Sequence, residues 1–126
     1  MIKGKYYWLP PVLWGCLIIV LSLLPGGKTN LQLFGIPHAD KIGHFGMYAI
    51  WSFLIYHAFI RPDRLTHAQA FWSTILMSSL IGMALEFGQS TVMIGRSYEL
   101  ADMMANALGA ITGAVMGYWL IKKISK

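Results

Sequence analysis

Charged residues are scarce in this chain. Only 12% of its 126 residues are Asp, Glu, Lys or Arg, whereas 56% are hydrophobic, and the mean hydropathy is +0.56. A soluble domain averages about 25% charged residues, so this chain has too little polar surface to cover a water-soluble globule. The composition therefore predicts an integral membrane protein, and the length allows a single domain over residues 1–126.

The chain also has a single cysteine and none of the common catalytic motifs. Cys16 has no partner cysteine, so an internal disulfide and a thiolate metal centre are both excluded. The chain has no H-E-x-x-H, P-loop, G-x-G-x-x-G or G-x-S-x-G motif. The formal charge is +5, but the basic residues form no long run. We therefore predict no nucleic-acid partner and no cofactor, and expect these residues to fix orientation or to contact membrane lipids.

Four apolar runs are long enough to cross a membrane. A spanning helix needs about 20 mostly apolar residues, and the runs cover residues 6–24, 42–60, 70–89 and 103–121. We therefore predict an all-α bundle of four transmembrane helices, up-down-up-down. We interpret the first run as a retained helix and not as a cleaved signal peptide, because it is long and is followed by a poor cleavage site.

The basic residues predict the orientation of this bundle. The chain ends and the second loop hold seven of them, and the first and third loops hold three. The two sets are Lys3, Lys5, Arg61, Arg64, Lys122, Lys123 and Lys126, against Lys28, Lys41 and Arg96. By the positive-inside rule, both termini lie in the cytoplasm.

Polar and ionisable residues gather at one end of three of the predicted helices. In an alternating bundle these three ends share one depth, on the extracytoplasmic side. Ionisable groups near hydrocarbon are costly, so such a cluster is a functional-site hypothesis. The candidate binding residues are Asp40, Lys41, His44, Glu86, Gln89, Arg96, Asp102 and Asn106.

Asp40, His44 and Tyr48 are spaced four residues apart and share one helix face. A carboxylate one turn before a histidine can orient the imidazole and raise its basicity, which suits a general base or a metal ligand. The alternative is a helix cap followed by ordinary residues at headgroup level. The sequence leaves both interpretations open.

Glu86 lies about one turn inside an apolar helix, with Gln89 on the same face. It must stay protonated or find a partner across the bundle, and Arg96 is the expected partner. A structural ion pair is the alternative to a functional role. Asp40, Glu86, Asp102 and His44 together offer donors for a divalent cation, but nothing in their spacing requires one, and no metal is predicted.

Glycines and tryptophans make two further patterns. Gly109, Gly113 and Gly117 form a G-x-x-x-G face, which predicts close helix packing within the chain or in a homo-oligomer. The tryptophans lie mostly near the ends of the apolar runs and are expected to form an interfacial belt. His67 is expected to be a loop residue without a fixed partner. The tryptophans are Trp8, Trp14, Trp51, Trp72 and Trp119.

Three segments resemble, in order, the motifs of the VanZ-like membrane proteins. Residues 40–48 (DKIGHFGMY) are similar to D-K-x-x-H-F-x-x-Y, and residues 86–89 (EFGQ) to E-x-x-Q. Residues 96–109 (RSYELADMMANALG) are similar to R-x(5)-D-x(3)-N-x-x-G. The resemblance implies a small helical protein of the bacterial inner membrane. Through the name-giving member it also implies tolerance of the glycopeptide teicoplanin, without implying a particular chemistry.

We therefore expect a binding or accessory protein whose polar pocket holds the headgroup of an envelope lipid or a lipid-linked cell-wall precursor. Arg96 and Lys41 would contact its phosphate. The first alternative is a membrane-embedded hydrolase or transferase, with His44 oriented by Asp40 as the base and with Glu86 or Asp102 as the acid or a metal ligand. The second is a structural membrane protein. A transporter is disfavoured, because we predict no second polar cluster at the cytoplasmic end.

Overall fold

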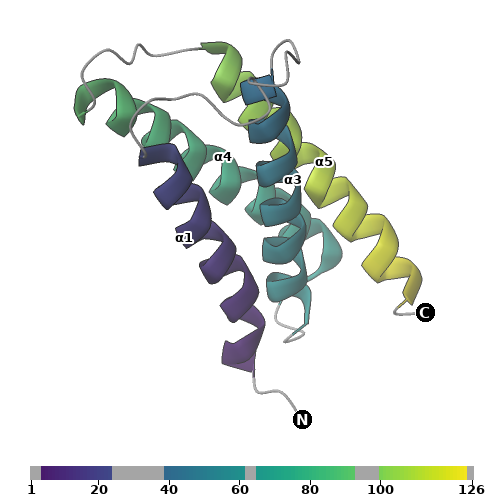
Figure 1. Cartoon of the computed structure of the whole chain (residues 1–126). Coiled ribbons are helices and arrows are strands. Elements are labelled where there is room, and N and C mark those ends of the chain that lie inside the picture. Colours follow the sequence, from purple (N-terminus) through teal and green to yellow (C-terminus); the bar gives the residue numbers. More distant parts are fainter. Residues whose placement is uncertain (1–3, 24–38, 62–64, 93–99, 125–126) are drawn as a thin grey trace.

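The computed structural model describes residues 4–23, 39–61, 65–92 and 100–124. Nearly all of these residues are helical. A 3-10 turn, η1 (Gly4–Trp8), precedes α1 (Leu9–Leu23), α3 (Ala39–Ile60), α4 (His67–Val92) and α5 (Leu100–Ile124). Successive helices run in opposite directions, so α1 begins and α5 ends at the same end of the bundle (Figure 1). No strand occurs within the described ranges, and for these residues the all-α prediction is confirmed.

The helix boundaries differ from the ends of the apolar runs. The α4 helix begins at His67 and not at residue 70, because Thr66 and Gln69 cap it reciprocally. The Gln69 backbone nitrogen donates to Thr66 Oγ1 over 3.2 Å, and the Thr66 nitrogen donates to Gln69 Oε1 over 3.0 Å. This is a capping box, which fixes a helix start from polar residues.

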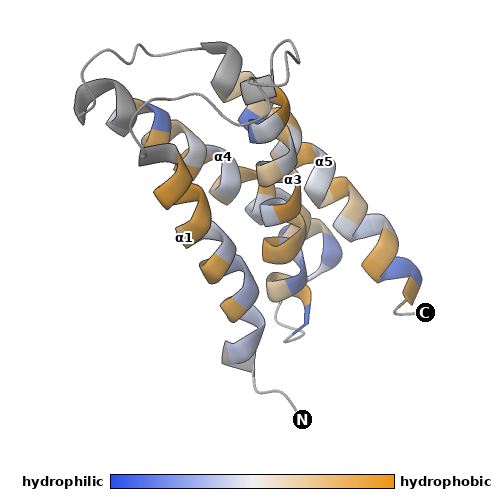
Figure 2. Ribbon diagram, in the orientation of Figure 1, coloured by the Kyte–Doolittle hydropathy of each residue, from blue (hydrophilic) through white to orange (hydrophobic). Residues whose placement is uncertain are grey.

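Two of the described helical stretches are long and apolar enough to cross a membrane, by length and composition. They are His67–Gly88 and Met103–Ile124, while Tyr6–Leu21 is apolar but shorter. Apolar residues run along α1 and α5, and the most hydrophilic ones lie near helix ends (Figure 2). A membrane crossing by all four helices therefore stays a prediction.

The α4 helix is apolar outside and polar inside. Large side chains line its exposed face, whereas every fourth residue of its buried face is small or polar. The exposed set is Trp72, Leu76, Leu80, Met83 and Phe87, and the buried set is Ala70, Thr74, Ser78, Gly82 and Glu86. Soluble proteins bury their large apolar side chains, while small residues at helix contacts are typical of membrane bundles. This distribution indicates a membrane protein.

The glycine face of α5 lies against α3 within the chain. A Cβ atom at Gly109 would strike the Phe45 carbonyl, and one at Gly113 would strike the Ala49 carbonyl. At Gly117 a Cβ atom would lie 2.8 Å from Cδ1 of Tyr56. The two helices therefore meet backbone to backbone. Self-association through the same face would require α5 to leave α3.

The α1 helix is held against α3 by two tryptophan side chains. Trp51 Nε1 donates to the Pro11 carbonyl over 2.8 Å, and Trp14 Nε1 donates to the Met47 carbonyl over 3.0 Å. Because Trp51 is only 6% exposed, the prediction of an interfacial belt is wrong for this residue. The position of a tryptophan along an apolar run does not say which way its side chain points, and Trp51 points at another helix.

Candidate functional site

A polar cluster forms where the N-terminal halves of α3 and α5 meet the C-terminal half of α4. Its best-defined contact joins His44 Nδ1 on α3 to Asn106 Oδ1 on α5 over 3.0 Å. His44 is half-buried and Asn106 is 3% exposed. An amide oxygen only accepts, so with this oxygen facing the ring, Nδ1 carries the hydrogen. In the neutral ring, Nε2 then keeps its lone pair and can accept a hydrogen bond or a proton.

Tyr48 lies one turn further along α3 and is 1% exposed. A Cβ atom at position 82 of α4 would lie 3.1 Å from Tyr48 Cε1 and 3.4 Å from Asn106 Nδ2. The absence of a side chain at Gly82 therefore lets α4 approach both residues closely. Sequence reasoning did not identify Gly82, although a glycine in the interior of a long helix was an available signal.

Glu86 brings a carboxyl group to the same region from α4. It follows Gly82 by one turn, is 5% exposed and interacts electrostatically with Tyr48. Three helices therefore bring His44, Glu86 and Asn106 together around Tyr48. Burying polar groups is costly unless they are paired, so this end of the bundle is specified by its polar contacts. The binding role of these residues stays a prediction.

The other predicted site residues lie outside the side chains that the structure describes. By backbone alone, Asp40 and Lys41 lie in the first turn of α3, and Gln89 and Asp102 lie within α4 and α5. Arg96 falls outside the described residues altogether. The expected contacts of Glu86 with Arg96 and of Asp40 with His44 therefore stay predictions. What the structure adds is a partner for His44 on another helix.

Metal binding can be considered only for part of the predicted donor set. Of the four donors, the side chains of His44 and Glu86 are described, and those of Asp40 and Asp102 are not. Within the described ranges, no group of three His, Cys, Asp or Glu residues could hold a metal ion. His44 and Glu86 are the two described residues that a bound cation would use.

A second polar cluster lies at the opposite end of the bundle. The hydroxyl of fully buried Tyr56 and Nδ1 of His67 are 2.6 Å apart. The ring of Tyr118 lies edge-on to His67 with centroids 5.9 Å apart, and its hydroxyl accepts from Lys122 Nζ over 2.8 Å. The predictions of a loop position for His67 and of no polar cluster here were wrong. The capping box that starts α4 brings His67 into the helix beside Tyr56, and the Thr66-x-x-Gln69 spacing was the available signal.

Buried hydroxyl groups lie along the bundle between the two polar ends. Ser52 Oγ on α3 donates to the Ala110 carbonyl on α5 over 2.6 Å. Thr74 and Ser78 on α4 are fully buried, and their hydroxyls have no hydrogen-bond partner in the described part of the chain. A buried hydroxyl without a partner is destabilising. Ser52 therefore ties α3 to α5, whereas Thr74 and Ser78 make no such tie within the described part of the chain.

The family comparison bears on most of the chain. Residues 9–122 match the sequence model of the VanZ/LLP1 family, a range that includes His44, Glu86 and Asn106. No curated protein is similar enough to match. No solved structure matches either.

Proposed function

The chain belongs to the VanZ/LLP1 family, and we propose that it is a four-span membrane protein that binds the headgroup of an envelope lipid in the polar cluster of α3, α4 and α5. The observation that carries the proposal is the buried His44–Asn106 hydrogen bond, with Glu86 close by, inside a bundle whose exterior is apolar. Polar groups at such a position are costly in a membrane and mark ligand sites more often than packing.

The proposed topology places both termini in the cytoplasm of a bacterium and the polar cluster toward the outer leaflet of its inner membrane. Its support is the common end at which α1 begins and α5 ends (Figure 1). Arg61, Lys122 and Lys123 are exposed near that end, as the positive-inside rule requires of cytoplasmic segments.

The described residues of the cluster match the uncharged polar part of such a headgroup. The lone pair of His44 Nε2 and the carboxyl oxygens of Glu86 can accept hydrogen bonds from sugar hydroxyls or amides. We assign the phosphate to Arg96 and Lys41, because their donors are cationic. The ligand class is therefore a phosphorylated envelope lipid or a lipid-linked cell-wall precursor. Tolerance of teicoplanin, which the family resemblance implies, is a further prediction of this proposal.

Binding is favoured over catalysis by the partner of His44. Its described partner is the neutral amide of Asn106, whose oxygen lies 3.0 Å from Nδ1. A carboxylate at Nδ1 is what stabilises the charged imidazole in a histidine base. The hydrolase alternative therefore rests on the predicted Asp40–His44 contact, whereas the binding role uses the polar contact that is described.

The test is native mass spectrometry of the protein extracted gently from its own membrane, with identification of bound lipids. Wild type, His44→Gln and Arg96→Ala are compared with Ser78→Ala, which removes a buried hydroxyl outside the cluster. We expect one phosphorylated lipid on wild type and on Ser78→Ala, and at least tenfold less on the two site variants at unchanged melting temperature.

Three other outcomes would contradict the proposal. Equal lipid occupancy in all four proteins would place the ligand elsewhere. No specific lipid on any of them, together with lower melting temperatures for the site variants, would leave the cluster a purely structural role. Release of a product from the bound lipid by wild type but not by His44→Gln would favour the hydrolase.

A further inference from the structure

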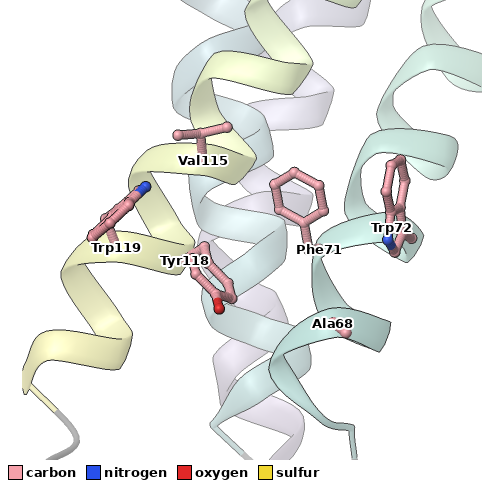
Figure 3. A pocket seen from close by; sticks show the side chains of 6 residues that line it. All are labelled: Ala68, Phe71, Trp72, Val115, Tyr118 and Trp119. Atoms are coloured by element: carbon pink, nitrogen blue, oxygen red, sulfur yellow. The ribbon is translucent and has the colours of Figure 1, made fainter.

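An open groove separates α4 from α5 at the end opposite the His44 cluster (Figure 3). Its volume is about 320 Å³, within the range of small-ligand sites. The walls are almost entirely hydrocarbon and aromatic rings. The lining residues are Ala68, Phe71, Trp72, Val115, Tyr118 and Trp119.

The groove opens onto the surface that the apolar exterior assigns to lipid. Trp72 is 67% exposed and Trp119 is 69% exposed, and they stand on opposite walls, one on α4 and one on α5 (Figure 3). Exposed tryptophans near the ends of apolar helices are typical of the headgroup boundary. An occupant from the membrane therefore has its chain between the walls and its polar end near this boundary.

A positive charge lies at the groove. Lys122 Nζ donates to the hydroxyl of Tyr118 over 2.8 Å and lies 4.8 Å from the centroid of the same ring. Because Tyr118 lines the groove, this contact holds the ammonium beside it. One N–H is used by the hydroxyl, and an ammonium has three. The other two can bind phosphate oxygens, and exposed Lys123 follows directly in the chain.

We propose that this groove binds one anionic phospholipid, with an acyl chain between Trp72 and Trp119 and its phosphate on Lys122. Charge selects an anionic over a zwitterionic lipid, because a lysine near a membrane surface favours negative headgroups. A second copy of the chain fits less well, since stable protein interfaces bury about 1,200 Å² or more, and this groove is lined by six residues. The site is separate from the proposed headgroup pocket. Its contact with lipid and its assignment to the cytoplasmic leaflet rest on the membrane topology proposed above.

The test uses full-length protein in phosphatidylcholine vesicles, with tryptophan fluorescence quenched by lipids that carry bromine on the acyl chain. Brominated phosphatidylglycerol is compared with brominated phosphatidylcholine, and the two titrations give a relative affinity. We expect wild type to favour phosphatidylglycerol about fivefold, which corresponds to one lysine at an anionic surface. Lys122→Gln should lose this preference and keep its quenching by both lipids.

Arg61→Gln is the matched control. Arg61 is exposed near the same end of the bundle, but it donates a hydrogen bond to His57 and does not line the groove. It should keep the preference. Val115→Phe should fill the groove and weaken quenching by both lipids while the helical content is unchanged.

Three results would overturn the proposal. Equal affinity of wild type for the two lipids would mean ordinary solvating lipid. An equal loss in Lys122→Gln and Arg61→Gln would mean a general surface charge. A cross-linked dimer in which brominated lipid no longer quenches would mean that a second copy covers the groove. A failure of the His44 pocket would leave all of these measurements unchanged.

Discussion

The α1 and α5 helices both pack on α3, yet they are held there in different ways. On the α5 side, glycines bring two backbones together, and a methyl group at Gly109 or Gly113 would strike a carbonyl of α3. On the α1 side, the side chains of Trp14 and Trp51 reach across and donate to backbone carbonyls. One contact depends on the absence of side chains, and the other depends on two large ones.

This difference separates the parts of the molecule that support the candidate site. The His44–Asn106 hydrogen bond joins α3 to α5. The close approach of these two helices at the α5 glycines therefore brings the two residues together. The α1 helix supplies none of the predicted site residues. Instead, Ile18 of α1 belongs to the same buried apolar group as Tyr48 and Trp51. The α5 contact therefore positions the site, and the α1 contact stabilises it.

The largest effect is expected from a substitution that breaks the α3–α5 contact, which is the tighter of the two. Gly113→Leu places a branched side chain against the Ala49 carbonyl and Ser52 Cβ, where a single methyl group already lacks space. Backbone atoms do not move aside as a flexible side chain does, so we expect a loss of more than about 3 kcal/mol in the free energy of unfolding in detergent, the upper end for overpacking. Unfolding followed by circular dichroism measures it.

Gly46→Ala is the control for this substitution. A Cβ atom there meets nothing within 4 Å, and alanine favours a helix over glycine by about 1 kcal/mol. This variant should be as stable as wild type or more so. If Gly113→Leu unfolds no more easily than Gly46→Ala, the two backbones are further apart than the structure places them.

The sequence predicted much of the site because helix direction alone places residues at one end. His44, Glu86 and Asn106 open or close apolar runs, and alternating runs bring those ends together. Which residues touch could not be predicted, since it depends on how far each helix is rotated about its axis. Asn106 was among the predicted binding residues, but its contact with His44 follows from the rotation at which the α5 glycines pack against α3.

Other features were missed because they depend on side-chain direction. Trp51 and Trp119 are the same residue type in similar apolar surroundings, but one is 6% exposed and the other 69%. Composition does not distinguish them. His67 was missed for a local reason instead, because the capping residues Thr66 and Gln69 extend α4 beyond its apolar run.

A smaller effect is expected on the α1 side. Trp51→Phe removes the N–H that donates to the Pro11 carbonyl and leaves an aromatic ring beside Gly15. We expect a loss of about 1–2 kcal/mol, which combines one buried hydrogen bond with reduced packing. Thermal unfolding in detergent measures it, with Trp119→Phe as an exposed control of unchanged stability. A loss as large as that of Gly113→Leu would show that α1 is as essential to the bundle as α5.

The smallest effect should have the opposite sign. Thr74 is fully buried, and its hydroxyl has no hydrogen-bond partner in the described part of the chain. Valine has nearly the same shape without the cost of burying that hydroxyl, so Thr74→Val should raise the free energy of unfolding by about 1 kcal/mol. Ser52→Ala, which removes a bonded hydroxyl from the α3–α5 contact, should lower it by about 0.6 kcal/mol. If both substitutions destabilise the protein, Thr74 has a partner that completes its hydrogen bond, such as a buried water. The packing of α4 in the bundle would then include a paired buried hydroxyl, as the α3–α5 contact does at Ser52.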